Sequence, residues 1–266
     1  MPSPTETDTR PPAGRTVAAG IVFAMAIEAD AFERLATRTI AVEADGLTFH
    51  EGIVAGRPVA WCVSGAGSKA AARAATLLVA GHRPATIVSA GFAGGLDPSL
   101  ARGAAVRAAQ VVDAAGHDPI ELSVPEHSDP AGATRRQGGG PPAVVAVDRI
   151  VTVERIVRTA AEKRSLLLAT GGRLVDLETH AVAGVARGAG LPCVSIRVIS
   201  DDATQELPAE VATLARPQSA VRRLGAALGA VGRRPGAALD LWRLYEHAVV
   251  DGRTLAAAVA RTLAAG

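Results

Sequence analysis

Apolar runs alternate with helix-like segments along most of the chain. The run from Thr16 to Met25 is apolar at nearly every position, which is typical of a parallel strand buried on both faces. Comparable runs predict further strands at Thr48–Val54, Pro58–Val63, Ala85–Ala90, Ala104–Asp113, Val144–Val157, Arg173–Asp176 and Pro192–Ile199. Helices are predicted at Ile27–Ala36, Lys69–Ala80, Ala160–Ala169 and Glu178–Ala189, and from Pro208 to the end with a break at 234–236.

This order of elements predicts an α/β fold. We expect a three-layer αβα sandwich around a mixed, mostly parallel central sheet, in which residues 55–57 form a hairpin turn. Residues 1–14 are polar and rich in Pro and predict a disordered tail, whereas 15–266 predict one domain with helices packed on it at the C-terminal end. Residues 114–142 are rich in Gly, Pro, Asp and His and predict a long surface loop.

Composition narrows the classes of function. Hydrophobic residues make up 48% of the 266 residues and aromatic residues 3%, so we expect a sizeable core of Ala, Val, Leu and Ile. The formal net charge of +2 comes with no basic stripe that carries aromatic residues, so nucleic acid is not an expected partner. Cys62 and Cys193 lie in apolar runs and predict buried thiols rather than a disulfide. No metal-ligand spacing occurs, and no metal or cofactor is expected.

The chain carries no pattern of a membrane span. No apolar stretch approaches the roughly 20 residues that cross a bilayer, and the start of the chain lacks the features of a secretory signal. We therefore expect a cytoplasmic protein. The apolar stripe in Leu239–Leu263 fits peripheral contact with a membrane or lipid-linked substrate, but we favour packing on the core or on a second subunit of a homo-oligomer.

Polar residues gather where predicted strands end, which is where α/β sheets bind ligands. Asp201 follows an apolar strand; partial burial there suits a general acid, and capping of a following helix is an equal alternative. Arg197 lies within the same strand and requires a buried partner, in a catalytic or a structural pair. Glu28 and Glu178 each begin a helix, where they could bind substrate or simply favour the helix N-terminus.

Two glycine-rich segments also follow predicted strands. Residues 64–67 and 91–95 expose backbone N–H groups that can bind a phosphate, a carboxylate or a sugar, although such glycines more often mark tight turns. Neither segment matches the Walker or the dinucleotide-binding pattern, which argues against an ATPase or a dehydrogenase.

Five stretches together resemble the purine nucleoside phosphorylase and nucleosidase superfamily, which includes the methylthioadenosine/S-adenosylhomocysteine nucleosidases. They are Gly20–Glu28, Ser64–Gly67, Gly91–Leu96, Val175–Glu178 and Arg197–Asp201, in the order and rough spacing of that superfamily. Other stretches are most similar to the hopanoid-associated phosphorylases, which are assigned the removal of adenine from adenosylhopane, a lipid-linked nucleoside. These stretches are Thr159–Lys163, Asp176–Val182, Arg197–Asp201, Leu207–Pro208 and Arg233–Pro235.

The resemblance implies a role for each matching residue. Asp201 would protonate a purine ring nitrogen as the glycosidic bond breaks, and Ser200 would orient Asp201. Glu28 would position or deprotonate an attacking water, and Arg197 matches an arginine near the nucleophile. Glu178 would hold the ribose hydroxyls. The remaining positions implied to contact substrate are Met25, Ser64, Gly67, Phe92, Ala93, Gly94, Ile156, Val157, Asp176 and Leu177.

Two departures from the family concern the nucleophile. Phe92 stands where many relatives have a serine that helps to hold phosphate or water, and 25–27 offer no phosphate-binding arginine. Phosphate as a co-substrate thus stays open, and we favour water.

The sequence therefore predicts an enzyme that releases adenine from a purine nucleoside, with a hopanoid-linked adenosine as the favoured substrate. The alternatives are a methylthioadenosine/S-adenosylhomocysteine-type nucleosidase and a non-catalytic nucleoside-binding protein. The joint presence of Glu28, Glu178 and Asp201 argues against the last of these.

Overall fold

The computed structural model describes residues 16–116, 118–124, 144–207 and 237–265, with side chains from 246 onward in the last range. The predictions for the tail 1–14, for most of the loop 114–142 and for 208–236 lie outside these residues. The strands are β1 (Ala19–Phe23), β2 (Thr37–Ala44), β3 (Leu47–Val54), β4 (Arg57–Val63), β5 (Ile87–Gly95), β6 (Ala105–Asp113), β7 (Ile120–Glu121), β8 (Val144–Thr152), β9 (Leu174–Asp176) and β10 (Cys193–Asp201). The helices are α1 (Ala26–Glu33), α2 (Ser68–His82), α3 (Ala160–Thr170), α4 (Thr179–Gly188) and α7 (Ala237–Ala265).

The strands form one mixed sheet. β1 runs parallel to both β4 and β5, and β10 runs parallel to β5. β3 and β2 extend the sheet antiparallel beyond β4. On the other side β10 pairs with β6, β6 with β8, β8 with β9, and β9 with the end of β5, so these strands close on one another. The predicted α/β fold with a mixed sheet is confirmed, and the local closure is an addition that the sequence did not predict.

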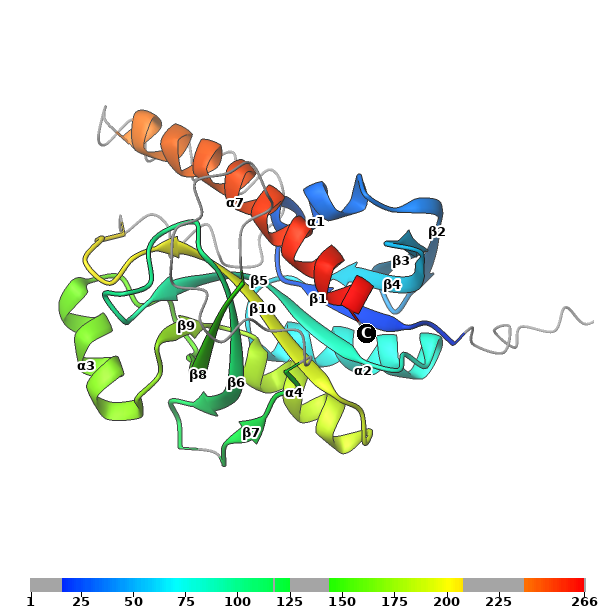
Figure 1. The fold of residues 1–266 in the computed structure, drawn as a ribbon, viewed down its shortest axis with the longest axis horizontal. Helices are drawn as coiled ribbons and strands as arrows, with labels where there is room; N and C mark the ends of the chain where they lie inside the picture. The colour runs from blue at the N-terminus through cyan, green and yellow to red at the C-terminus, as the bar shows by residue number, and fades with distance from the viewer. Residues whose placement is uncertain (1–15, 117, 125–143, 208–236, 266) are drawn as a thin grey trace, which may run out of the picture.

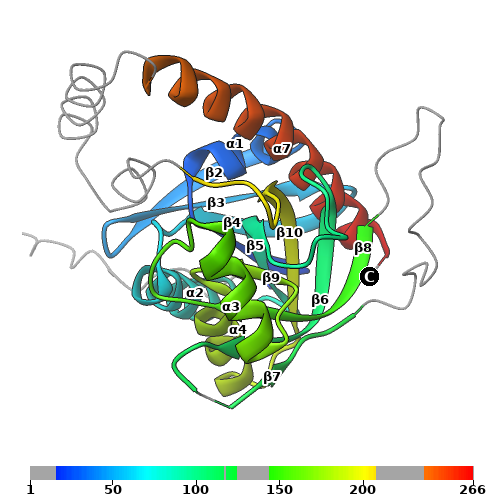
Figure 2. The ribbon, with the colours of Figure 1, turned by 90° about the vertical axis from the view of Figure 1, so that its left-hand side faces the viewer.

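Helices cover both faces of the sheet, as Figure 1 shows, with α1 and α7 on one side and α2 and α4 on the other. β1 supplies both cores because its side chains alternate: Val22 packs with the α2 and α4 residues, and Ile21 and Phe23 pack with those of α1 and α7. The same two helix layers are seen from another side in Figure 2.

Helix α2 illustrates why an Ala-rich segment forms a layer. Ala71, Ala74, Ala75 and Leu78 follow the i, i+3, i+4, i+7 pattern, and all four are fully buried. Small residues on this stripe let the helix approach the sheet closely.

The C-terminal helix packs on the core over its described side chains. Leu255, Ala258 and Val259 of α7 are fully buried in the same cluster as the α1 residues. The first part of the predicted apolar stripe, 239–245, lies outside the described side chains. None of the described helices has both the length and the apolarity needed to cross a membrane.

Most predicted elements occur in their predicted places, including the β3–β4 hairpin and its turn. β2 was not predicted, because all its residues are exposed and no buried face marks it in the sequence. The prediction that residues 91–95 form a loop is wrong, because β5 continues through Gly95 in register with β10. Cys62 and Cys193 are buried free thiols, as predicted.

Candidate active site

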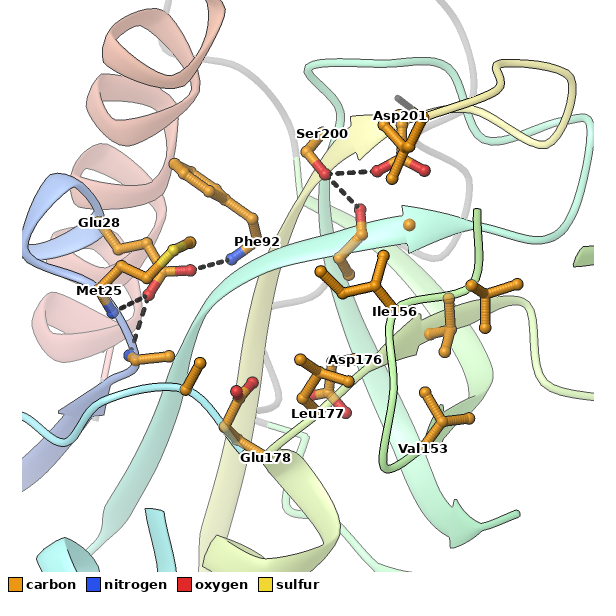
Figure 3. A pocket seen from close by; sticks show the side chains of 17 residues that line it. Met25, Glu28, Phe92, Val153, Ile156, Asp176, Leu177, Glu178, Ser200 and Asp201 are labelled. Carbon is orange, nitrogen blue, oxygen red and sulfur yellow. Dashed lines mark hydrogen bonds between the residues drawn. The ribbon is translucent and has the colours of Figure 1, made fainter. Parts of the chain in front are cut away.

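The carboxyl ends of β1, β5, β8, β9 and β10 surround a cavity of about 250 Å³. Its lining is largely aliphatic, and four carboxylates reach it: Glu28, Asp176, Glu178 and Asp201. Figure 3 shows Glu28 and Met25 at one end of the cavity and Ser200 and Asp201 at another. The other lining residues are Ala24, Ala66, Phe92, Ala93, Gly94, Val153, Ile156, Val157, Val175, Leu177 and Leu207.

Glu28 is held by backbone groups from two elements. Its Oε2 accepts hydrogen bonds from the N–H groups of Ala24 (2.9 Å) and Met25 (2.8 Å), and its Oε1 accepts one from Phe92 (2.8 Å). A carboxylate has about four acceptor sites, so one stays available for a water or a substrate hydroxyl. Burial raises the pKa of Glu28, opposed by these hydrogen bonds and by the charge of Arg197. The residue thus both stabilises the start of α1 and can accept a proton.

Phe92 contributes to this end of the cavity mainly through its backbone. Its N–H is the donor to Glu28, and β5 can pass this close because residue 91 is glycine. A Cβ on Gly91 would lie 2.5 Å from Nη1 of Arg197 and 2.8 Å from Oε1 of Glu28. Gly91 therefore permits the close approach of an acid and a cation beneath the cavity.

Arg197 lies behind the cavity wall rather than in its lining. Its side chain is 2% exposed, and its Nη2 lies 2.7 Å from Asp176 Oδ2, Ser89 Oγ and Thr179 Oγ1. The structure thus brings Arg197 close to Asp176 and Glu28, but Arg197 is not among the lining residues. Any effect of Arg197 on a substrate therefore passes through these two carboxylates.

Asp176 accepts four hydrogen bonds from protein donors. Its Oδ1 accepts a hydrogen bond from Thr152 Oγ1 (2.7 Å), and its Oδ2 accepts from the N–H (3.0 Å) and hydroxyl of Thr179 and from Arg197. Three of these four contacts fall on Oδ2, so Asp176 reaches the cavity with one acceptor site left on Oδ1. The arrangement fits a carboxylate that fixes the junction of β9 and α4.

Glu178 stands at the N-cap position of α4 but does not cap that helix with its side chain. Instead its Oε1 accepts a hydrogen bond from the Gly67 N–H (2.8 Å), so the side chain bonds the loop after β4 rather than its own helix. Burial and the negative charge of Asp176 raise the pKa of Glu178 to about 7. Near neutral pH this carboxylate can change its charge when a ligand donates to it.

The loop after β4 supports Glu178 through its backbone. Gly67 has a φ of 98°, in the region that favours glycine, and its N–H faces Glu178. Ser64 donates its hydroxyl to the carbonyl of Gly65 (2.7 Å), and within this loop it is Ala66 that lines the cavity.

Asp201 is the last residue of β10 and is 4% exposed. Its Oδ1 accepts a hydrogen bond from Ser200 Oγ (2.7 Å), and its Oδ2 lies 2.6 Å from Nζ of Lys163. The helix-cap alternative is wrong for this residue, because it is Asp202 that accepts from the N–H groups of Thr204 (2.9 Å) and Gln205 (3.0 Å). The Asp201 side chain is directed into the cavity lining instead.

The site contains no obvious metal centre: among the described residues, no group of three His, Cys, Asp or Glu side chains is placed to hold a metal ion. The lining carboxylates can accept a proton, donate one or neutralise positive charge on a ligand.

Residues 18–231 match the family model described as the phosphorylase superfamily. The chain belongs to the phosphorylase superfamily. This confirms the family that the sequence motifs indicated.

Solved structures of nucleosidases share the fold of this superfamily member. A methylthioadenosine/S-adenosylhomocysteine nucleosidase from Neisseria meningitidis, in complex with methylthio-immucillin-A, is 19% identical over 93% of this chain and 99% of that chain, with a TM-score of 0.66. The corresponding nucleosidase from Colwellia psychrerythraea, in complex with adenine, is 24% identical over 74% and 86%, with a TM-score of 0.62. The futalosine hydrolase of Helicobacter pylori is 17% identical over 92% and 97%, with a TM-score of 0.65. At these identities the likeness is one of fold.

The superfamily member also has a polar site residue that the sequence did not single out. Lys163 contacts Asp201 from α3, far away in the chain. The sequence marks Lys163 only weakly: of the 28 Lys and Arg residues, the two lysines are Lys69 and Lys163. The apolar residues Val153 and Leu207 also lay outside the predicted site, and no pattern marks them.

Proposed function

We propose that the protein hydrolyses the N-glycosidic bond of an adenine nucleoside and releases adenine. The observation that carries this proposal is the placement of Glu28 and Asp201 in one buried cavity, with Glu178 also in its lining. Glycosidic cleavage needs an acid for the leaving base and a base for the nucleophile, and these two carboxylates supply one group for each task.

Asp201 is assigned to the base of the nucleoside. Protonation of a purine ring nitrogen lets the electrons of the breaking bond leave on a neutral base, and Ser200 fixes one oxygen of the Asp201 carboxyl group. Ile156 and Val157, which also line the cavity, supply an apolar surface for the ring.

Glu178 and Glu28 are assigned to the sugar and to water. Oε1 of Glu178 is bonded to Gly67, and its other oxygen has no hydrogen bond among the described residues, so it can accept from a ribose hydroxyl. Both carboxylates stabilise the positive charge that develops on the sugar. Glu28 has an acceptor site free for water, and burial raises its pKa toward that of a general base.

Water is favoured over phosphate as the nucleophile because of the charge of the lining. Four carboxylates reach the cavity, and no lysine or arginine is among the described lining residues. The nearby cations Arg197 and Lys163 are each paired with a carboxylate. A phosphate dianion would meet like charges in this low-dielectric space.

For the substrate, we propose an adenosine that carries an apolar group, and we favour a hopanoid-linked adenosine. Its support is the sequence resemblance of stretches such as Thr159–Lys163, together with an aliphatic lining that includes the 37% exposed Met25 at its edge. Methionine adapts to irregular apolar ligands. A methylthioadenosine-type substrate is the alternative, and homo-oligomeric assembly stays a prediction.

Adenine release measured across substrates tests this proposal. Purified protein is given adenosine, methylthioadenosine or detergent-dispersed adenosylhopane, each with and without phosphate. We expect adenine release without phosphate, fastest with the lipid-linked substrate, and a loss of about 10²- to 10⁴-fold in kcat for Asp201→Asn. Asp148→Asn is the control, since Asp148 is an exposed acid outside the cavity lining. Equal losses for both variants, or no adenine from any substrate, would refute the assignment.

A further inference from the structure

We propose that Lys163 stores the proton that Asp201 delivers to the leaving purine, a role that rests on the proposed nucleosidase function. Lys163 lies on α3, a helix fixed at its start by reciprocal hydrogen bonds between Thr159 and Glu162 and at its end by Gly171 with a φ of 66°. Lys163 is 0% exposed and is the only buried residue of this helix. Because the one buried side chain of α3 is charged, its ion pair fixes which face of the helix packs on the rest of the fold.

The surroundings of Nζ form a built site for an ammonium group. It lies 2.6 Å from Oδ2 of Asp201 and donates to the carbonyl oxygens of Asp202 and of Gln205 (3.0 Å). Three acceptors match the three protons of an ammonium ion.

When Nζ of Lys163 donates to Oδ2 of Asp201, the proton between them belongs to the nitrogen, and Asp201 relays it. Oδ2 of Asp201 has no partner other than Lys163 among the described residues, so the pair holds one exchangeable proton between nitrogen and oxygen. The Lys163–Asp201 pair then acts as the general acid. Lys163 carries the proton, and Asp201 transfers it to the purine. Lys163 is thereby a positioning residue that acts through Asp201.

The choice of lysine supports a proton store over a purely structural cation. This chain uses arginine at nearly every basic position, and Arg197 serves in the other buried pair. Arginine stays protonated in proteins, whereas a buried lysine can give up its proton. Among the described residues, lysine thus occurs in the buried pair whose carboxylate is assigned a proton transfer.

The proton moves as follows. The C1′–N9 electron pair leaves with the purine, the proton of the Lys163–Asp201 pair is transferred to the ring through Asp201, and neutral adenine results. Lys163 is left as a neutral amine beside the Asp201 carboxylate. Water adds its oxygen to C1′ and gives its proton to Glu28. Exchange with solvent then returns a proton to the pair and removes one from Glu28, so the cycle is balanced.

The test compares two leaving groups. Adenine needs a proton to leave, whereas the nitrophenolate of p-nitrophenyl β-D-ribofuranoside does not. For Lys163→Met and Lys163→Arg we expect kcat for adenine release to fall by about 100-fold, with kcat for nitrophenolate release changed less than about threefold. Lys163→Arg keeps a cation that can bind the same carbonyl groups, so it remains informative if the methionine variant fails to fold. The exposed Lys69 is changed to Met as the control.

Equal losses on both substrates, or full rescue of adenine release by Lys163→Arg, would overturn the proton store and leave a structural cation. Wild-type protein that releases no adenine from any nucleoside would overturn the proposed function itself. The two failures are therefore distinguishable in one set of assays.

Discussion

Two buried ion pairs bring a carboxylate to the same cavity, Arg197 with Asp176 and Lys163 with Asp201. Asp176 accepts four hydrogen bonds, from Thr152, Thr179 and Arg197. Asp201 has one hydroxyl and one ammonium as partners. A carboxylate held by many fixed donors stabilises the fold, whereas one held by few donors keeps acceptor sites for a ligand.

Breaking the first pair gives the largest expected effect on stability. Arg197→Met leaves Asp176 buried without its cation, so the free energy of unfolding should fall by about 3–5 kcal/mol in urea titrations. Arg173→Met is the matched control, because the Arg173–Asp97 pair is half exposed and should cost less than about 1 kcal/mol.

An Arg197→Met variant with unchanged stability and a tenfold lower kcat would contradict this comparison. It would instead give Arg197 the catalytic role that the sequence suggested.

Glu28 is intermediate between the two aspartates, since three backbone donors leave it one acceptor site. Glu28→Gln cannot take a proton from water, so kcat for adenine release should fall by about 100-fold with KM changed less than about threefold. Initial rates on correctly folded variant protein measure this. Asp30→Asn, an exposed acid on the same helix, should retain wild-type rates. Retention of kcat by Glu28→Gln would remove Glu28 as the base.

The pH dependence of stability tests Glu178, the carboxylate whose pKa is raised to about 7. Its pKa of about 7 in the folded protein lies above the 4.5 of an unperturbed glutamate, so the folded state binds this proton more tightly than the unfolded chain. The resulting stability is complete below about pH 4.5 and is lost as the pH rises through about 7.

Between pH 5 and pH 8 the wild type should therefore lose about 2 kcal/mol of stability relative to Glu178→Gln, which has no such proton. Because the ionised form accepts from ribose hydroxyls, KM should also decrease as the pH rises through this range. Parallel stability curves for the two proteins would show that Glu178 is not perturbed by its surroundings.

The sequence predicted the fold well where a hydrophobic pattern existed. β1 and α2 follow from apolar runs and helical spacing, but β2 has no buried face and left no pattern. The sequence also marked the strand ends that carry Glu28, Glu178 and Asp201. It could not rank Asp176 against Asp201, because Thr152 and Arg197, which bind Asp176, and Lys163, which binds Asp201, come from distant elements.

Lys163 shows the same limit more clearly. Its contact with Asp201 joins α3 to β10, and no local spacing encodes it. A lone lysine in an arginine-rich chain is a signal only after the structure has placed a carboxylate beside it.

The identity of the sugar product tests the central claim most directly. With phosphate present in excess, the wild-type protein should convert each nucleoside molecule into one adenine and one free reducing sugar, because the carboxylate-lined cavity favours water as nucleophile. Formation of a sugar 1-phosphate in equal amount to adenine would contradict the account and identify the protein as a phosphorylase.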